Sequence, residues 1–425
     1  MIPSGALLEL DVTKPAAGGR MLARHGSLVV LAWGAIPGER VRARVERVTK
    51  GVVFADTVDV LLPSPDRRGV EGDWRCGGNV FAHVAYPRQV QLKAEIIQDA
   101  FLRIARVPLA SPPPLIESPE VGYRMRARLH AEGARLGFFR EGSHVLCDAT
   151  RTGQFLPATN DWIVNAGETL AREQLTGLAA IEIAENVGGD ERACHFELHP
   201  GADVQAFAVL GNGLVGASAQ TADARSATRL CGSPAVSDVL HLGGDDSAPV
   251  LRLTRDARAF FQGNRYLLER FVRHVIARVP QGLVVDLYAG VGFFGLALAA
   301  TGREAVVLVE GDPVSGEDLQ ANARPFDRAR VERCSVEAFL TGAGRRVGSD
   351  TTYVVDPPRT GMSREALHGI LRAAPGRVVY VSCDVATLAR DTRVLLDSGF
   401  ELQELTGLDL FPNTAHIETV AVFVR

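Results

Sequence analysis

The sequence lacks the features that mark membrane, secreted and metal-binding proteins. Its apolar runs are all shorter than the ~20 residues that a membrane-spanning helix needs, and its first residues do not form a signal peptide. The six cysteines include no CxxC pair, so we expect no metal site and no disulfide framework. The net charge of −4 excludes a globally basic surface for nucleic acid but permits a local basic groove. These absences predict a cytoplasmic protein whose cysteines act singly.

The chain of 425 residues, 46% of them hydrophobic, is long enough for two or three domains. Residues 1–63 contain short alternating segments separated by Gly, Pro and charged turns, which predicts a small β-barrel. Residues 64–250 predict a central α+β domain, with a helical apolar pattern over 89–106 and a loop-like end over 221–250. Residues 251–425 alternate apolar strands with helical segments, which is typical of a doubly wound parallel α/β sheet. The expected strands of that sheet cover residues 282–287, 305–310, 352–356 and 377–382.

A glycine-rich turn follows the first of these strands. Gly290, Gly292 and Gly295 let the backbone approach a ligand closely, where a helix begins and offers free N–H groups. Glu310 closes the next strand about 20 residues later, where an acid suits the two hydroxyls of a ribose. This spacing predicts a cofactor that contains adenosine, and it fits a dinucleotide and S-adenosylmethionine (SAM) equally well.

Three further segments carry groups that such a site could use. Asp356 begins a stiff Asp-Pro-Pro-Arg loop at a strand end, for which a hydride-transferring enzyme has no evident need. Glu418 lies near the C-terminal strand, where a carboxylate can act as a base. Residues 260–264 combine two aromatic rings with Gln262 and an asparagine, which predicts a packed lid with amide hydrogen bonds.

Cys383 differs from the other cysteines because it follows a strand of the parallel sheet. A helix is expected over residues 387–396, and its N-terminus favours a thiolate at the preceding strand end. Arg359 and Arg390 are expected to add to that positive field. The sequence therefore predicts an ionised thiol in the same cleft as Asp356.

An arginine-rich segment lies in the central domain. Arg124, Arg126 and Arg128 alternate, so in a strand their side chains share one face. Such a face is either simply solvated or a track for an RNA backbone, and the pattern is compatible with both.

Together these segments resemble one family, the SAM-dependent RNA 5-methyluridine methyltransferases, which modify uracil in tRNA and 23S rRNA. The matching motifs have the family's order and spacing; they are Phe260–Asn264, Asp286–Gly292, Asp356–Gly361, Val381–Cys383 with Thr387–Asp391, and Phe411–Thr419. The likeness extends upstream to Tyr123–Arg140 and His83–Lys93, and weakly to residues 1–63, which resemble the family's TRAM barrel. It implies a C-terminal Rossmann-like SAM methyltransferase domain.

The resemblance also implies the site residues, the cofactor and the partner. Cys383 matches the family nucleophile, and Glu418 matches the base that removes the uracil ring proton. The positions that contact SAM in the family are matched by Gln262, Tyr288, Glu310 and Asp356. The implied function is methyl transfer from SAM to carbon 5 of a uridine in rRNA or tRNA, through a covalent Cys–uracil adduct. We expect the enzyme to be a monomer without a metal ion.

The sequence departs from the family in two places. Many members hold an iron–sulfur cluster on four cysteines, of which only Cys76 is present here, so we expect no cluster. Asp384 and Val385 replace the usual Asn-Pro after the nucleophile. The alternatives are an RNA methyltransferase that makes 5-methylcytosine and a non-catalytic RNA-binding protein.

Overall fold

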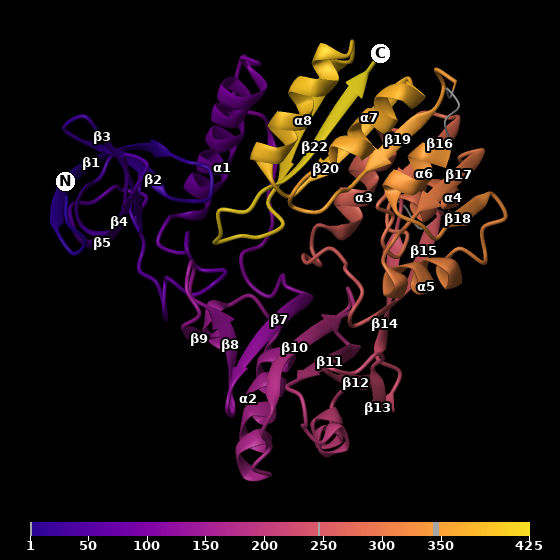
Figure 1. Cartoon of the computed structure of the whole chain (residues 1–425), viewed down its shortest axis with the longest axis horizontal. Coiled ribbons are helices and arrows are strands. Elements are labelled where there is room, and N and C mark those ends of the chain that lie inside the picture. Colours follow the sequence, from indigo (N-terminus) through magenta and orange to yellow (C-terminus); the bar gives the residue numbers. More distant parts are fainter. Residues whose placement is uncertain (1, 245–246, 343–347) are drawn as a thin grey trace.

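The computed structural model describes residues 2–244, 247–342 and 348–425, and Figure 1 shows the chain arranged in three regions. The N-terminal region is a closed barrel with the strand order β1-β2-β3-β5-β4. Alternate side chains face its interior, as Leu8, Leu10 and Val12 do in β1. The strands are β1 (Leu7–Pro15), β2 (Met21–His25), β3 (Leu28–Trp33), β4 (Arg40–Thr49) and β5 (Val52–Leu62). The expected small barrel is confirmed, and β2 is a strand that the sequence pattern did not predict.

The central region is built on a sheet with the order β13-β12-β11-β10-β7-β8-β9. One face of this sheet packs against α2 (Pro157–Arg172), which buries Trp162 and Ile163 among the apolar side chains of the strands. The strands are β7 (Arg126–Glu132), β8 (Arg135–Phe139), β9 (Leu146–Asp148), β10 (Leu178–Glu185), β11 (Arg192–Leu198), β12 (Gly216–Thr221) and β13 (Thr228–Gly232). The other face carries the charged side chains of β7, β10 and β11.

Residues 221–250 are not the loop that their composition suggested. They contain β13 and β14 (Ala235–His241), and β14 pairs antiparallel with β15 (Val250–Asp256). Leu240 and Leu251 of this two-stranded sheet are buried in the core of the C-terminal region. The small residues of the segment gave no strand pattern, because cross-strand pairing rather than local propensity stabilises it.

The C-terminal region is an α/β sheet with the order β18-β17-β16-β19-β20-β22-β21-β6. Neighbours from β18 to β20 are parallel, and β22 runs antiparallel between β20 and β21. Its strands are β6 (Leu115–Ile116), β16 (Leu283–Leu287), β17 (Ala305–Val309), β18 (Ala329–Glu332), β19 (Thr352–Val355), β20 (Arg377–Ser382), β21 (Glu401–Leu408) and β22 (Glu418–Val424). The expected doubly wound sheet is confirmed. Within the described ranges, no helix is both long and apolar enough to span a bilayer.

Helices cover both faces of this sheet, so neighbouring strand residues point into different cores. Val284 packs with α3, α4 and α5, whereas Val285 packs with α6, α7 and α8. These helices are α3 (Leu268–Ile276), α4 (Gly295–Ala300), α5 (Pro313–Asn322), α6 (Val336–Gly342), α7 (Arg364–Ala373) and α8 (Val385–Asp397). The chain passes from β16 outward to β18 and then returns to β19, which creates a topological switch point between β16 and β19.

A segment from before the central sheet completes the C-terminal region. Helix α1 (Tyr86–Ala100) continues into a π-helical turn (Phe101–Ala105), and Ile97 and Phe101 are buried in the core with α8. Strand β6 (Leu115–Ile116) then extends the C-terminal sheet beside β21. In Figure 1, α1 stands between the barrel and α8.

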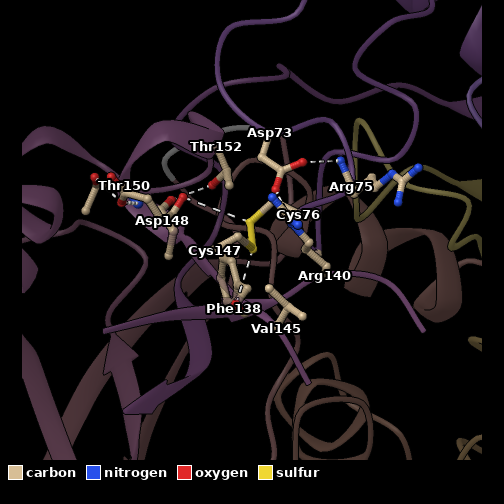
Figure 2. Close-up of a disulfide and its surroundings, with 12 residues drawn as sticks. Asp73, Arg75, Cys76, Phe138, Arg140, Val145, Cys147, Asp148, Thr150 and Thr152 are labelled. Atoms are coloured by element: carbon tan, nitrogen blue, oxygen red, sulfur yellow. Dashed lines mark hydrogen bonds and ion pairs between the residues drawn. A yellow bond between two sulfur atoms is a disulfide. The ribbon is translucent and has the colours of Figure 1, made fainter. Parts of the chain in front are cut away.

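Cys76 and Cys147 form a disulfide, so the expectation that all the cysteines act singly is wrong for this pair. Figure 2 shows the bond joining the segment after the barrel to β9 of the central sheet. An ion pair between Asp73 and Arg140 lies beside it. The 71-residue separation gave no sign of the pairing, because only the folded chain brings residue 76 alongside the β8–β9 hairpin.

Candidate active site

Strand topology brings the predicted reactive residues to one edge of the C-terminal sheet. β19 and β20 are parallel, so Asp356 and Cys383, which follow them, lie at the same edge. β22 runs antiparallel to β20 and begins at Glu418. Because Ser382 pairs with Thr419, Cys383 and Glu418 lie close together just beyond the last pair of the ladder, and the charge of Glu418 acts on the thiol.

Asp356 is hydrogen-bonded to Gln262, which the sequence had placed in a separate motif. Gln262 is buried, and its Nε2 donates to Oδ2 of Asp356 at 3.1 Å. Burial raises the pKa of Asp356 to about 7, although the hydrogen bond from Gln262 acts in the opposite direction. Two residues later, Asn264 donates to the carbonyl of Leu410 at 3.0 Å and ties this segment to the loop before β22.

Glu418 is only 3% exposed, and its carboxyl group faces the site. Among the residues that the structure describes, its Oε1 has no hydrogen-bond partner. Burial, followed by the negative charge of Asp356, holds the pKa of Glu418 well above its usual range, while Arg359 opposes this shift. A carboxylate whose pKa is raised is a stronger base than an ordinary glutamate once it is ionised, so Glu418 is suited to remove a proton.

Cys383 is a free, half-buried cysteine whose environment disfavours the thiolate. Burial, then the charges of Glu418 and Asp356, raises the pKa of its thiol to about 12, whereas Arg359 lowers it. This environment therefore disfavours the ionised thiol that the sequence predicted. The N-terminus of α8 does not supply the expected field, because the side chain of Asp384 already caps it by accepting from the N–H of Thr387 at 2.8 Å.

The two arginines expected near the thiol behave differently. Arg359 acts on both Cys383 and Glu418. Arg390 instead pairs with Asp391 at 2.7 Å and donates to the carbonyl of Thr360, so its charge is balanced away from the thiol. The prediction is correct for Arg359 and wrong for Arg390.

The glycine-rich turn after β16 forms an open cradle at the switch point. Gly290 has a φ of 56°, and nothing lies within 4 Å of the position that a Cβ would occupy there. The carboxylate of Glu310 accepts from the N–H groups of Gly290 and Asp312, each at 2.7 Å. Asp286 accepts from the N–H of Gly295 at 2.8 Å and so holds the start of α4. The turn thus leaves room for a ligand beside a carboxylate that is held in place.

Tyr288 lies in the same turn but lines a different space. It has a φ of 64°, which is costly for a residue with a side chain and common at binding sites. It lines a cavity of about 750 Å³ together with Met362, Leu367 and Arg390, on the side of α7 and α8. Gln262 and Asp356 therefore meet directly, whereas Tyr288 lines the cavity beside α7 and α8.

Helix α1 holds the loop that leads into Glu418. Lys93 Nζ lies 2.6 Å from Oδ1 of Asp409, and both side chains are fully buried. Gln89 donates to Oδ1 of Asn413 at 2.8 Å and accepts from its backbone N–H at 2.9 Å. Asp409 and Asn413 were not expected to have roles. The sequence feature that could have indicated these contacts is the presence of two polar residues, Gln89 and Lys93, on the apolar face of a predicted helix.

Comparisons with known proteins show which family and which fold this chain resembles. The family model described as tRNA (Uracil-5-)-methyltransferase matches residues 346–425. The chain is 32% identical to the 23S rRNA (uracil(1939)-C(5))-methyltransferase RlmD of Pseudomonas putida, over 99% of this chain and 94% of that protein. RlmD of Pseudomonas entomophila is likewise 32% identical, with the same shares covered. The fold is similar to that of the Pyrococcus abyssi tRNA (uracil-54, C5)-methyltransferase in complex with S-adenosyl-L-homocysteine, with a TM-score of 0.77 and 24% identity over 98% of this chain and 100% of that chain.

Proposed function

The chain belongs to the RNA (uracil-C5)-methyltransferase family, and on that premise we propose that it methylates carbon 5 of a uridine in rRNA or tRNA through a covalent bond between Cys383 and the uracil ring. The observation that carries the proposal is the pairing of β20 with β22, at whose end the free thiol of Cys383 and the buried carboxyl group of Glu418 lie close together. Among the described residues, Oε1 of Glu418 has no hydrogen-bond partner. Asp356 and Gln262 lie beside this pair. We expect the enzyme to act as a monomer.

The methyl donor would be SAM, which supplies a methyl group on a positively charged sulfur. The cradle at Gly290 fits such a molecule, because the space that a side chain would fill is open. Glu310 would bind the ribose, since each of its carboxylate oxygens keeps a lone pair beyond its backbone hydrogen bond. Gln262, Tyr288 and Asp356 complete the proposed set. No metal ion or cluster has a place in the proposed mechanism.

Cys383 would attack carbon 6 of the uracil, which makes carbon 5 nucleophilic enough to take the methyl group. A thiol with a pKa of about 12 is almost entirely protonated at neutral pH, so the attack depends on charge compensation when substrates bind. In the free protein, Arg359 is the described cation that lowers the pKa of this thiol. Glu418 would then remove the proton from carbon 5, and the Cys383–carbon 6 bond would break as the ring double bond reforms.

The test uses labelled SAM with in vitro transcribed 23S rRNA and tRNA. The wild-type protein should place the label in 5-methyluridine. Glu418→Gln should slow turnover by roughly 10²–10⁴-fold and accumulate an RNA–protein adduct that survives denaturing electrophoresis, because its proton cannot be removed. Cys383→Ala should form no adduct, whereas the control Cys334→Ala, which removes another free thiol, should behave as wild type. Label in 5-methylcytosine, or no label in either RNA, would refute the proposal.

A further inference from the structure

A row of cations and aromatic rings runs from the central sheet to the loop before Glu418. The guanidinium of Arg124 lies 5.4 Å from the ring centre of Phe138 in β8 and 5.5 Å from that of Phe411. The rings of Phe411 and His416 meet edge to face at 6.1 Å. His416 Nε2 then lies 3.4 Å from a guanidinium nitrogen of Arg359. We call these five residues the arginine–aromatic row.

Arg124 differs from the arginines that follow it along the same segment. Arg126 and Arg128 both pair with Glu182, at 3.3 and 3.2 Å, and Arg128 also pairs with Glu197. Their face of the sheet is therefore balanced internally rather than free to bind an anion. Across the part of the chain that the structure describes, Arg124 makes no ion pair, and its buried Nε has no hydrogen-bond partner.

Arg359 provides a second unbalanced cation at the other end of the row. Its side chain is exposed, and within the described ranges it has no carboxylate at ion-pair distance. It lies beside His416, two residues before Glu418, so this end of the row borders the reactive pair. Both guanidinium groups are held next to rings, which restrains their orientation without neutralising their charge.

We propose that the arginine–aromatic row binds the RNA backbone on either side of the target uridine, with Arg124 and Arg359 each contacting a phosphate. This inference rests on the proposed function, because the row would bind RNA next to the site where the uracil is methylated. Guanidinium groups bind phosphate oxygens through two parallel hydrogen bonds, and rings give single-stranded segments a surface for stacking. A chain with net charge −4 attracts polyanions poorly as a whole, so cations beside the site would contribute much of its attraction for RNA.

The test compares Arg124→Gln with Arg128→Gln, which removes the same charge from the same region but from an internal ion pair. Binding of the 23S rRNA and tRNA transcripts is measured by filter binding at several salt concentrations. Arg124→Gln should weaken binding about ten-fold and reduce the slope of log affinity against log salt by about 0.7. Arg128→Gln should stay within about two-fold of wild type. Arg124→Lys should restore the slope but only part of the affinity, because an ammonium makes no bidentate contact.

Two controls keep the outcome clear. Urea unfolding of Arg124→Gln shows whether the packing between the two rings has been lost, and Arg359→Gln, at an exposed position, repeats the binding test without that risk. Unchanged affinity and slope in both Arg124→Gln and Arg359→Gln, or equal weakening in Arg128→Gln, would refute the proposal that the row binds RNA. If the wild-type protein binds RNA in this way but methylates neither transcript, the proposed function fails while the row stands. Binding of acidic polypeptides that matches RNA binding would instead assign the row to a protein partner.

Discussion

Lys93→Met should destabilise the protein by about 4 kcal/mol at pH 7, because it strands a carboxylate in the interior. Lys93 and Asp409 are both 0% exposed, and Nζ lies 2.6 Å from Oδ1. Within the described residues, the second carboxylate oxygen has no hydrogen-bond partner, so the ammonium is the group that compensates the charge. Lys93 Nζ also donates to the carbonyl of Phe411 at 3.0 Å, and this contact holds the loop before Glu418.

The magnitude follows from the protonation of Asp409, by which a buried carboxylate without a cation loses its charge. A carboxyl that cannot stay charged takes up a proton, and for an ordinary aspartate at pH 7 this costs about three pH units at about 1.4 kcal/mol each. The variant would then be neutral at this position when folded and charged when unfolded. A group that holds its proton more tightly in the folded state loses stability as pH rises, so the deficit should shrink by about 1.4 kcal/mol per unit between pH 7 and pH 4.

The assay is urea unfolding at pH 7 and pH 5, followed by circular dichroism. The matched control is the double variant Lys93→Met/Asp409→Leu, which replaces the ion pair by an apolar pair and should lie within about 1 kcal/mol of wild type. A single variant that loses less than about 1 kcal/mol at pH 7, or that loses as much as the double variant, would refute the reasoning.

The remaining predictions concern other parts of the chain. Replacing Cys76 and Cys147 together by serine should lower the free energy of unfolding by about 4 kcal/mol, because their bond closes a loop of 71 residues. Urea unfolding with and without dithiothreitol measures this loss, and equal unfolding midpoints would contradict it. Alkylation of Cys383 by iodoacetamide, followed by peptide mapping, should accelerate about ten-fold per unit from pH 7 to 9, because its pKa is about 12; a plateau near pH 7 would show a stabilised thiolate. Gly292 has a φ of 102°, and a Cβ added there would lie 2.4 Å from a leucine of α4. Gly292→Ala should therefore weaken SAM binding, measured by calorimetry, and lower the free energy of unfolding by at least about 2 kcal/mol. Gly302→Ala, with φ 86° and open space around it, should lose only about 1 kcal/mol and keep its SAM affinity.

The parallel sheet could be predicted from the sequence because its signals are local. Strands buried on both faces are written as continuous apolar runs, and four of them are found within one or two residues of the expected bounds. The rule that parallel strands present their carboxyl ends at one edge then brings Gly290, Asp356 and Cys383 together without further information. The motifs around them assigned the family in the same way.

The state of the site could not be predicted, because it depends on groups far away in the chain. Burial, then the charges of Glu418 and Asp356, raises the pKa of the Cys383 thiol to about 12, and Asp384 caps the helix N-terminus that was expected to favour a thiolate. The same holds for β14, whose strand character comes from its pairing with β15.

Short-range patterns of apolar and polar residues thus determined which elements form and which edge of the sheet carries the predicted site residues. Tertiary structure alone decided which cysteines are joined, which arginines are paired with glutamates, and which groups surround the thiol of Cys383 and raise its pKa. These properties arise from contacts and electric fields between residues that are remote in sequence, and neither spacing nor composition encodes them.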